Sequence, residues 1–440
     1  MLRISQLSVT GLCLIALCGC GTFLGTKTKK PLPGERISIL VHEQTLEPDA
    51  GTENETIRLP APTPNLEWPQ AGGYPNHAMH HIKVGDRLQE MWSTGIGSGS
   101  STDDKLITQP VVAGDRIFTM DSESVVRAFA ISNGDEVWEI DLIPDHEDDG
   151  HVSGGLAVEN DKLFVTTGFA EVIALNIEDG KILWRRNIGT PMRAPPAVRG
   201  NRVFAVTLTN KLFALNGSTG KTLWNHAGIE EGTNFLGGAA PAVDSGVVVV
   251  AYSSGEVAAL KVENGQELWN DSLAVARRPN STTLLSSIRG RPVIDRGIVT
   301  VISNSNLITA INLRTGRRIW DRAIGGIESP WVAGEFIFVL TNNSEMVALG
   351  RRTGRIHWVT PLPQWEDPED KEGRIIWTGP ILISDRLIVA GSNGEAMSVS
   401  PYTGKVLGKV EMPDGVTISP IVANGTVFFL SDDADLVAYR

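Results

Sequence analysis

The stretch PAVRGNRVFAVTLTNKLFALNGSTGKTLW, from Pro196 to Trp224, contains the pattern that decides the fold. It holds two runs rich in β-branched and aromatic residues, RVFAVT at 202–207 and KLFALN at 211–216, followed by a Thr-Gly turn and a tryptophan. Such runs are typical of strands, and Gly220 supplies the positive φ that a tight hairpin needs. We therefore expect four strands in this stretch, the last of which ends at the tryptophan.

The same frame occurs seven times along the chain. The copies span 110–138, 155–184, 196–224, 241–269, 292–320, 330–358 and 380–408. Six of them end in tryptophan: Trp138, Trp184, Trp224, Trp269, Trp320 and Trp358. Successive copies begin about 44 residues apart, which suits a four-stranded propeller blade and is too long for a leucine-rich or ankyrin repeat. We interpret the tryptophans as structural wedges that fill the space between blades.

An eighth copy begins at Pro420 and reaches Arg440, so it supplies three strands and lacks the outermost one. An unpaired blade edge invites aggregation, and LQEMW at 88–92 matches the missing strand. We predict that this N-terminal strand pairs with the three C-terminal strands, with Trp92 in the position of the other tryptophans. The predicted fold is all-β: an eight-bladed β-propeller over residues 67–440, with four antiparallel strands per blade.

The N-terminus has the features of a lipoprotein signal. An apolar run at 9–18 follows Arg3 and is too short to span a bilayer. It ends in Leu-Cys-Gly-Cys, which is similar to the bacterial lipobox, so we expect residues 1–19 to be a signal peptide and Cys20 to carry the lipid. Residues 20–66 are rich in Pro, Thr, Glu and Gly, which predicts a flexible tether.

Composition excludes several classes of function. The formal net charge of −12 disfavours nucleic acid as a partner. All three cysteines lie within the first 20 residues, so the predicted propeller has no thiol for catalysis, metal binding or a disulfide. No GxSxG, HExxH or P-loop spacing occurs. We predict no enzymatic activity and no cofactor.

Two clusters could suggest a metal, and we expect neither to bind one. His77, His80 and His81 have no carboxylate or cysteine nearby to complete a site, so we interpret them as solvated. The acidic loop DHEDDG at 145–150 has alternating carboxylates, but Leu156 stands where a calcium loop requires a bidentate glutamate.

The repeat itself, seen in STGKTLW at 218–224 and RTGRRIW at 314–320, resembles the repeat of pyrroloquinoline-quinone-type propellers. Together with the lipobox, WPQAGG at 68–73 and PLPGERIS at 31–38, the chain resembles the BamB family of outer-membrane lipoproteins. The resemblance implies a non-catalytic scaffold, lipid-anchored at the periplasmic face of the outer membrane. It also implies docking on the barrel-inserting subunit (BamA) and other members of the assembly complex, and help in delivering unfolded outer-membrane proteins.

The resemblance further implies that loops between the middle blades make the docking surface. The corresponding positions here are Met192, Arg193, Phe235, Leu236, Ser287 and Arg289. The arginine and acidic residues of the family pattern do not match position by position, so these six are candidates only.

Two other functions remain open at this point. One is a periplasmic quinone-dependent oxidoreductase, as in other proteins with this repeat. The other is an envelope propeller that binds sugars or peptidoglycan in a funnel lined by exposed aromatic residues, for which Trp331, Trp365 and Trp377 are the candidates.

Overall fold

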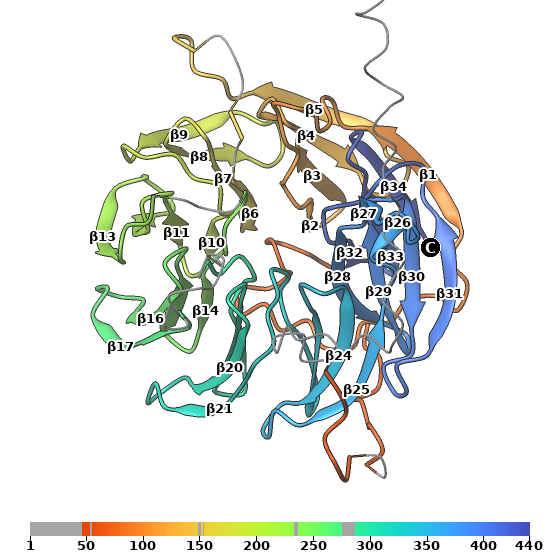
Figure 1. Cartoon of the computed structure of the whole chain (residues 1–440). Coiled ribbons are helices and arrows are strands. Elements are labelled where there is room, and N and C mark those ends of the chain that lie inside the picture. Colours follow the sequence, from red (N-terminus) through yellow and green to blue (C-terminus); the bar gives the residue numbers. More distant parts are fainter. Residues whose placement is uncertain (1–45, 53–54, 148–150, 153, 233–235, 275–286) are drawn as a thin grey trace, which may run out of the picture. The chain divides into compact units, whose positions relative to one another are not determined.

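The computed structural model describes residues 46–52, 55–147, 151–152, 154–232, 236–274 and 287–440. Within these ranges the chain forms strands, turns and loops but no helix, and hence no helix that could cross a membrane. Eight four-stranded antiparallel sheets are arranged around a central axis (Figure 1). The predicted eight-bladed propeller is therefore confirmed.

Seven blades follow one another along the chain. Blades 1 to 4 consist of β2 (Val111–Ala113), β3 (Arg116–Met120), β4 (Val125–Ala130) and β5 (Glu136–Asp141); β6 (Gly155–Glu159), β7 (Lys162–Thr166), β8 (Glu171–Asn176) and β9 (Ile182–Asn187); β10 (Ala197–Val198), β11 (Arg202–Val206), β12 (Lys211–Asn216) and β13 (Thr222–Ala227); β14 (Ala242–Asp244), β15 (Val247–Ala251), β16 (Glu256–Lys261) and β17 (Glu267–Ser272). Blades 5 to 7 consist of β18 (Val293–Asp295), β19 (Ile298–Ser303), β20 (Leu307–Asn312) and β21 (Arg318–Arg322); β22 (Trp331–Ala333), β23 (Phe336–Leu340), β24 (Glu345–Gly350) and β25 (Ile356–Pro361); β28 (Trp377–Ile383), β29 (Arg386–Gly391), β30 (Glu395–Val399) and β31 (Val406–Glu411). A small hairpin of β26 (Trp365–Asp367) and β27 (Glu372–Arg374) lies between blades 6 and 7 in the sequence.

Blade 8 joins the two ends of the propeller. It contains β32 (Ile421–Ala423), β33 (Thr426–Leu430), β34 (Asp435–Tyr439) and the N-terminal strand β1 (Glu90–Gly95), in the sheet order β1-β34-β33-β32. Trp92 pairs with Ala438, the register in which the other repeat tryptophans pair within their own blades. The predicted closure by the N-terminal strand is confirmed, and it leaves no gap in the ring.

The middle strands of the blades are apolar on both faces because each blade is covered by its two neighbours. Four consecutive residues of β15, Val248 to Ala251, are buried, and β7 and β11 show the same pattern. A strand covered on both faces has a continuous apolar run in place of alternation. The core therefore lies between the blades and forms a belt around the axis.

The repeat tryptophans join neighbouring blades. Each indole Nε1 donates a hydrogen bond of 2.7–3.2 Å to a backbone carbonyl of the next blade, three residues before that blade's turn glycine. The donor and acceptor pairs are Trp92 and Ile131, Trp138 and Ile177, Trp184 and Gly217, Trp224 and Val262, Trp269 and Leu313, Trp320 and Arg351, and Trp358 and Pro401. Seven of the eight junctions thus share one geometry.

The turn glycine of each copy meets two requirements at once. Gly220 has a φ of 66°, which permits the hairpin, and a Cβ built on it would lie 2.7 Å from the Trp184 ring. The equivalent glycines from Gly134 to Gly404 all have positive φ and all leave a Cβ only 2.6–2.9 Å from the preceding blade's indole. Because real Cβ atoms do not approach ring atoms this closely, the indole can lie flat only on a glycine.

An axial segment, residues 65–84, connects the inner strands of all eight blades. It follows one circuit around the axis and meets blade 8 first, then blades 1 to 7 in order. Its hydrogen bonds run from Asn65 to Val422, Trp68 to Val112, Pro69 to Val158, Gln70 to Val198, Pro75 to Val243, Asn76 to Ile294, His80 to Trp331 and Ile82 to Leu382. The inner strand of each blade has one edge whose backbone N–H and C=O groups cannot pair with another blade. The axial segment provides hydrogen-bond partners at these edges.

Two expectations about this region are wrong. Residues 47–66 belong to the same compact unit as the blades, so the flexible tether does not extend to residue 66. Ile57 is buried, and Asp49 forms an ion pair with Arg322 at 2.9 Å. The blades thus supply the apolar and polar partners that this Pro-rich stretch lacks by itself.

The second wrong expectation concerns the histidines. His77 and His81 are buried and not solvated, and each forms a hydrogen bond with a backbone carbonyl, of Pro292 and Pro60 respectively.

The first prediction isolates the contact between indole and glycine. Gly200 and Gly220 lie in the same blade with φ values of 61° and 66°, but a Cβ at Gly200 would meet nothing within 4 Å. Gly200→Ala should cost about 1–2 kcal/mol, the penalty of positive φ alone. Gly220→Ala should cost about 1–3 kcal/mol more, because it also displaces Trp184. Urea unfolding of both variants measures the difference, and equal losses would contradict the role given to the indole.

The second prediction concerns acid stability. Burial lowers the pKa of His77 to about 3, and the nearby Arg291 guanidinium adds to this effect. Because an unfolded histidine titrates near pH 6.5, the unfolded chain binds more protons between pH 6.5 and 3, so stability falls as the pH drops through this range. From pH 7 to pH 5 the loss from His77 should be about 2 kcal/mol.

His77→Asn is the matched variant, because asparagine tolerates the φ of 59° at this position and keeps a side-chain donor. Its urea unfolding free energy should depend on pH less steeply than that of the parent protein, by about the same 2 kcal/mol. An identical pH dependence in the two proteins would show that His77 does not set it.

Candidate partner-docking surface

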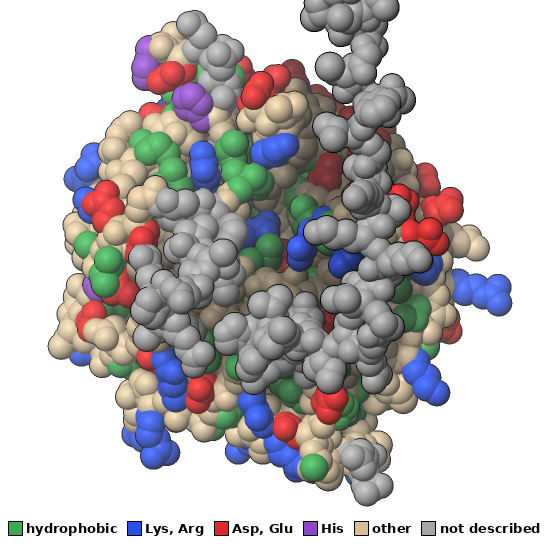
Figure 2. Space-filling model, viewed as in Figure 1, with side chains coloured by type: hydrophobic (Ala, Val, Ile, Leu, Met, Phe, Trp, Pro, Cys, Tyr) green, Lys and Arg blue, Asp and Glu red, His purple; other side chains and the backbone are tan. Residues whose placement is uncertain are grey.

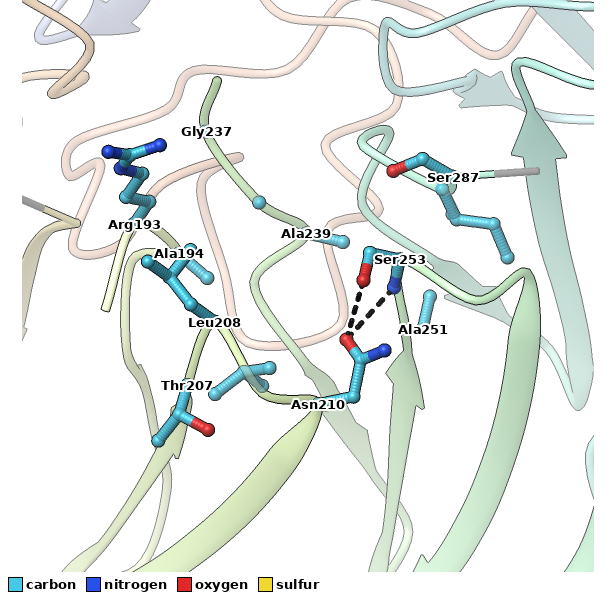
Figure 3. Close-up of a pocket in the computed structure, with 13 residues that line it drawn as sticks. Arg193, Ala194, Thr207, Leu208, Asn210, Gly237, Ala239, Ala251, Ser253 and Ser287 are labelled. Carbon is cyan, nitrogen blue, oxygen red and sulfur yellow. Dashed lines mark hydrogen bonds between the residues drawn. The ribbon is translucent and has the colours of Figure 1, made fainter. Parts of the chain in front are cut away.

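Three loops between the middle blades converge on one surface. They precede β10, β14 and β18, and they bring Arg193, Gly237 and Ser287 around one small pocket with the β11–β12 turn (Figure 3). Each loop joins the outer strand of one blade to the inner strand of the next, and residues 233–235 and 275–286 of the second and third loops lie outside the described residues. The pocket volume is about 40 Å³, room for one or two water molecules and far below the size of a small-molecule site.

Asn210 holds the base of this surface. Its side-chain oxygen accepts hydrogen bonds from the backbone N–H and hydroxyl of Ser253, at 3.1 and 2.8 Å, as the dashed lines in Figure 3 show. Its amide nitrogen donates to the Ile229 carbonyl at 2.6 Å. Asn210 is 2% exposed and has a φ of 55°. One buried amide therefore ties a turn of blade 3 to blade 4.

The structure separates the six predicted docking residues. Met192 and Ser287 are buried, at 0% and 3% exposure, so neither can present its side chain to a partner without rearrangement. Leu236 is 38% exposed, and Arg193 is half-buried at the rim of the pocket. Phe235 lies outside the described residues.

The two arginines on this surface differ in their partners. Arg289 donates to the Glu328 carboxylate at 3.5 Å and lies 3.3 Å from the place of a Cβ at Gly237. Arg193 makes no hydrogen bond or ion pair through its guanidinium with any residue in the described part of the chain. A cation without a partner among the described residues, on a surface whose second loop has an exposed leucine, suits a partner with an acidic and an apolar side chain.

Further basic groups lie toward the axis. Burial lowers the pKa of Arg291 to about 10, with Glu328 opposing the shift and Arg289 adding to it, so Arg291 is charged at neutral pH. Figure 2 shows Lys and Arg side chains near the middle of this face, whereas many Asp and Glu side chains lie toward its rim. A chain with a net charge of −12 thus presents basic side chains near its axis.

One small chamber lies near the axis, among the described residues. A chamber of about 20 Å³ lies between the axial segment and the inner strands, with Trp68, His77 and Arg291 in its walls. Trp331 and Trp377 are buried at 8% and 4% exposure, and their indoles donate to His80 and Pro363. Trp365, on the β26–β27 hairpin, is partly exposed. The three tryptophans therefore do not line a funnel of exposed aromatic side chains.

Sequence reasoning missed Asn210 and Glu328, which position the surface. An asparagine directly before a strand, in a turn that needs positive φ, was a usable signal for Asn210. No sequence signal pointed to Glu328, because its contact with Arg289 joins two different blades. The described residues contain no cluster of three potential metal ligands, and residues 148–150 of the acidic loop lie outside them.

Comparisons with known proteins agree with this architecture. The family model described as "Outer membrane protein assembly factor BamB" matches residues 122–360, more than half of the chain. The outer membrane protein assembly factor BamB of Salmonella typhimurium is 30% identical over 356 residues, which cover 79% of this chain and 88% of the relative.

Two solved structures show how widely the fold is shared. The crystal structure of BamB from Moraxella catarrhalis superposes with a TM-score of 0.65 at 19% identity, covering 80% of this chain and 98% of that one. A quinohemoprotein alcohol dehydrogenase from Pseudomonas putida reaches the same TM-score at 12% identity, covering 85% and 80%. Shape alone does not separate the two, but the sequence match does: this chain belongs to the family of the outer membrane protein assembly factor BamB.

Proposed function

We propose that the chain is a non-catalytic scaffold subunit of the complex that assembles outer-membrane β-barrel proteins. The observation that carries the proposal is the family match over most of the chain. The chain would bind the barrel-inserting subunit, contact other members of the complex and assist the delivery of unfolded outer-membrane proteins. Nucleic acid is not expected as a partner of so acidic a chain.

The loops before β10, β14 and β18 support a docking role. Among their described residues, Arg193, Gly237 and Ser287 meet around one pocket, and Asn210 bonds Ile229 and Ser253 beside it. Arg193 supplies a cation that no described residue pairs and Leu236 an exposed apolar side chain, while Glu328 orients Arg289. We assign these three side chains to the contact and leave out Met192 and Ser287, whose burial supports a structural role.

Quinone-dependent oxidation is the less favoured function. The axial chamber of about 20 Å³ admits one water molecule and is too small for a tricyclic quinone. The axial segment takes up the space beside the inner strands through its bonds to every blade. The likeness to a quinohemoprotein dehydrogenase, at 12% identity, shows a shared fold only.

Anchoring supports the same location. We propose that residues 1–19 are removed and that Cys20, which lies outside the described residues, carries the lipid at the periplasmic face of the outer membrane. Several acyl chains on one residue give stable anchoring, whereas one chain is marginal. The remaining tether would then run from Cys20 to about residue 46, where the compact unit begins.

The third prediction tests the docking surface. Arg193→Glu should lower recovery of the barrel-inserting subunit from solubilised outer membranes about tenfold or more, because the reversed charge repels an acidic partner. Arg199→Glu is the control, since Arg199 is exposed on the β10–β11 hairpin of the same blade and changes the net charge equally. If both variants recover the subunit as well as the parent protein does, the contact lies elsewhere.

The fourth prediction tests the anchor. Cys20→Ser should abolish incorporation of radiolabelled palmitate and release the protein from sedimented membranes, because the acylated thiol is gone. Cys18→Ser should leave both unchanged, as residue 18 lies within the peptide that is removed. Palmitate labelling that persists in Cys20→Ser would place the lipid on another residue.

A further inference from the structure

The junction between blades 7 and 8 differs from the other seven. Gly408 stands at the position of the repeat tryptophan, opposite Ser398, whereas every repeat tryptophan stands opposite an alanine. In blade 8 the outer strand β1 comes from the N-terminal part of the chain, so no glycine hairpin joins it to β34. Both halves of the indole–glycine contact are therefore missing here.

An open apolar groove takes the place of the indole. Its volume is about 160 Å³, and its walls come from both blades. The lining residues are Leu88, Ile388, Ala396, Met397, Ser398, Gly408, Lys409, Val410, Met412, Phe429 and Tyr439. All six residues of β31 are exposed, including Val410 at 55%, so the groove is reached from solvent.

The groove is shaped for a side chain that this chain does not provide. A Cβ built on Gly408 would find its nearest neighbour, the Ser398 hydroxyl, at 3.7 Å, which is ordinary contact distance, and the backbone at Gly408 is not in the positive-φ region. By contrast, a Cβ at the turn glycines would clash with an indole. Nothing steric requires glycine at position 408, and no side chain of the described residues fills the space beside it.

We infer that this groove binds an aromatic side chain of a partner polypeptide. Seven junctions of the same molecule show what fits between two such blades, and in each the occupant is an indole. A cavity of about 150 Å³ lined by aliphatic and aromatic side chains is known to take a benzene ring. The volume of the groove, about 160 Å³, is of the same size.

The ring surfaces in the groove favour an aromatic occupant over an aliphatic one. Phe429 and Tyr439, in edge-to-face contact at 5.7 Å, provide ring surfaces against which such a ring can stack.

The fifth prediction tests the groove with N-acetyl-tryptophanamide as the ligand. The lipid-anchored full chain, purified in detergent with ¹³C-methyl methionine, should show saturable shifts of the Met397 and Met412 methyl signals at ligand concentrations on the order of millimolar. Gly408→Trp places an indole in the groove and should weaken this binding at least about tenfold, while the melting temperature rises by about 1–3 °C. Leu407→Trp, which adds an exposed indole outside the lining, should change neither.

Recovery from outer membranes tests whether the occupant belongs to the assembly complex, a point that rests on the proposed function. Gly408→Trp should lower recovery of one complex member at least about threefold relative to Leu407→Trp. Absent methyl shifts, or equal shifts in both variants, would overturn the groove as an aromatic site whatever the recovery shows. If the ligand binds but Gly408→Trp recovers every complex member as well as Leu407→Trp does, the occupant of the groove is not a member of the complex. If the parent protein itself recovers no member of the complex, the proposed function is contradicted instead.

Discussion

The contact between an indole and a glycine, which recurs at seven of the eight blade junctions, is the constraint on which the rest of the structure depends. The indole needs a flat backbone surface and a carbonyl acceptor, and a hairpin with glycine at positive φ offers both. The glycine is therefore fixed twice, by its own φ and by the ring above it. Repetition of this pair sets the spacing between blades, and a constant spacing is what allows eight blades to close into a ring.

The axial segment is a second and independent means of closure. Hydrogen bonds between outer strands join blade 8 at its rim, but they do nothing for the open edges of the inner strands. A single extended segment that visits every inner strand in order links the blades at their narrow ends. Loss of any one blade contact would leave seven others, so the segment distributes its stabilising effect over the whole ring and makes the structure hard to open locally.

The fold could be predicted from the sequence because it depends on a local pattern that is repeated. Gly220 and Trp224 lie four residues apart, and the same pair recurs in other copies, so even the closure by Trp92 follows from counting strands. The course of residues 47–84 could not be predicted in this way. Its contacts, such as Ile57 with the core and His77 with Pro292, join positions far apart in the sequence, and a composition rich in proline and threonine does not reveal them.

The docking residues were predicted only in part for a related reason. Position in a loop does not determine burial, so Met192 and Arg193, adjacent in the sequence, differ completely in what they can offer to a partner.

The outer strands of the blades are poor sites for pairing with another chain. The residue before most repeat tryptophans, such as Val137 or Leu183, is an extra residue in a bulge and is exposed. Bulges blunt strand edges against pairing with other chains. Bulges therefore disfavour recognition at the outer strands, and the axial segment covers the inner strands. The loops and the one junction without an indole are the surfaces that remain for recognising a partner.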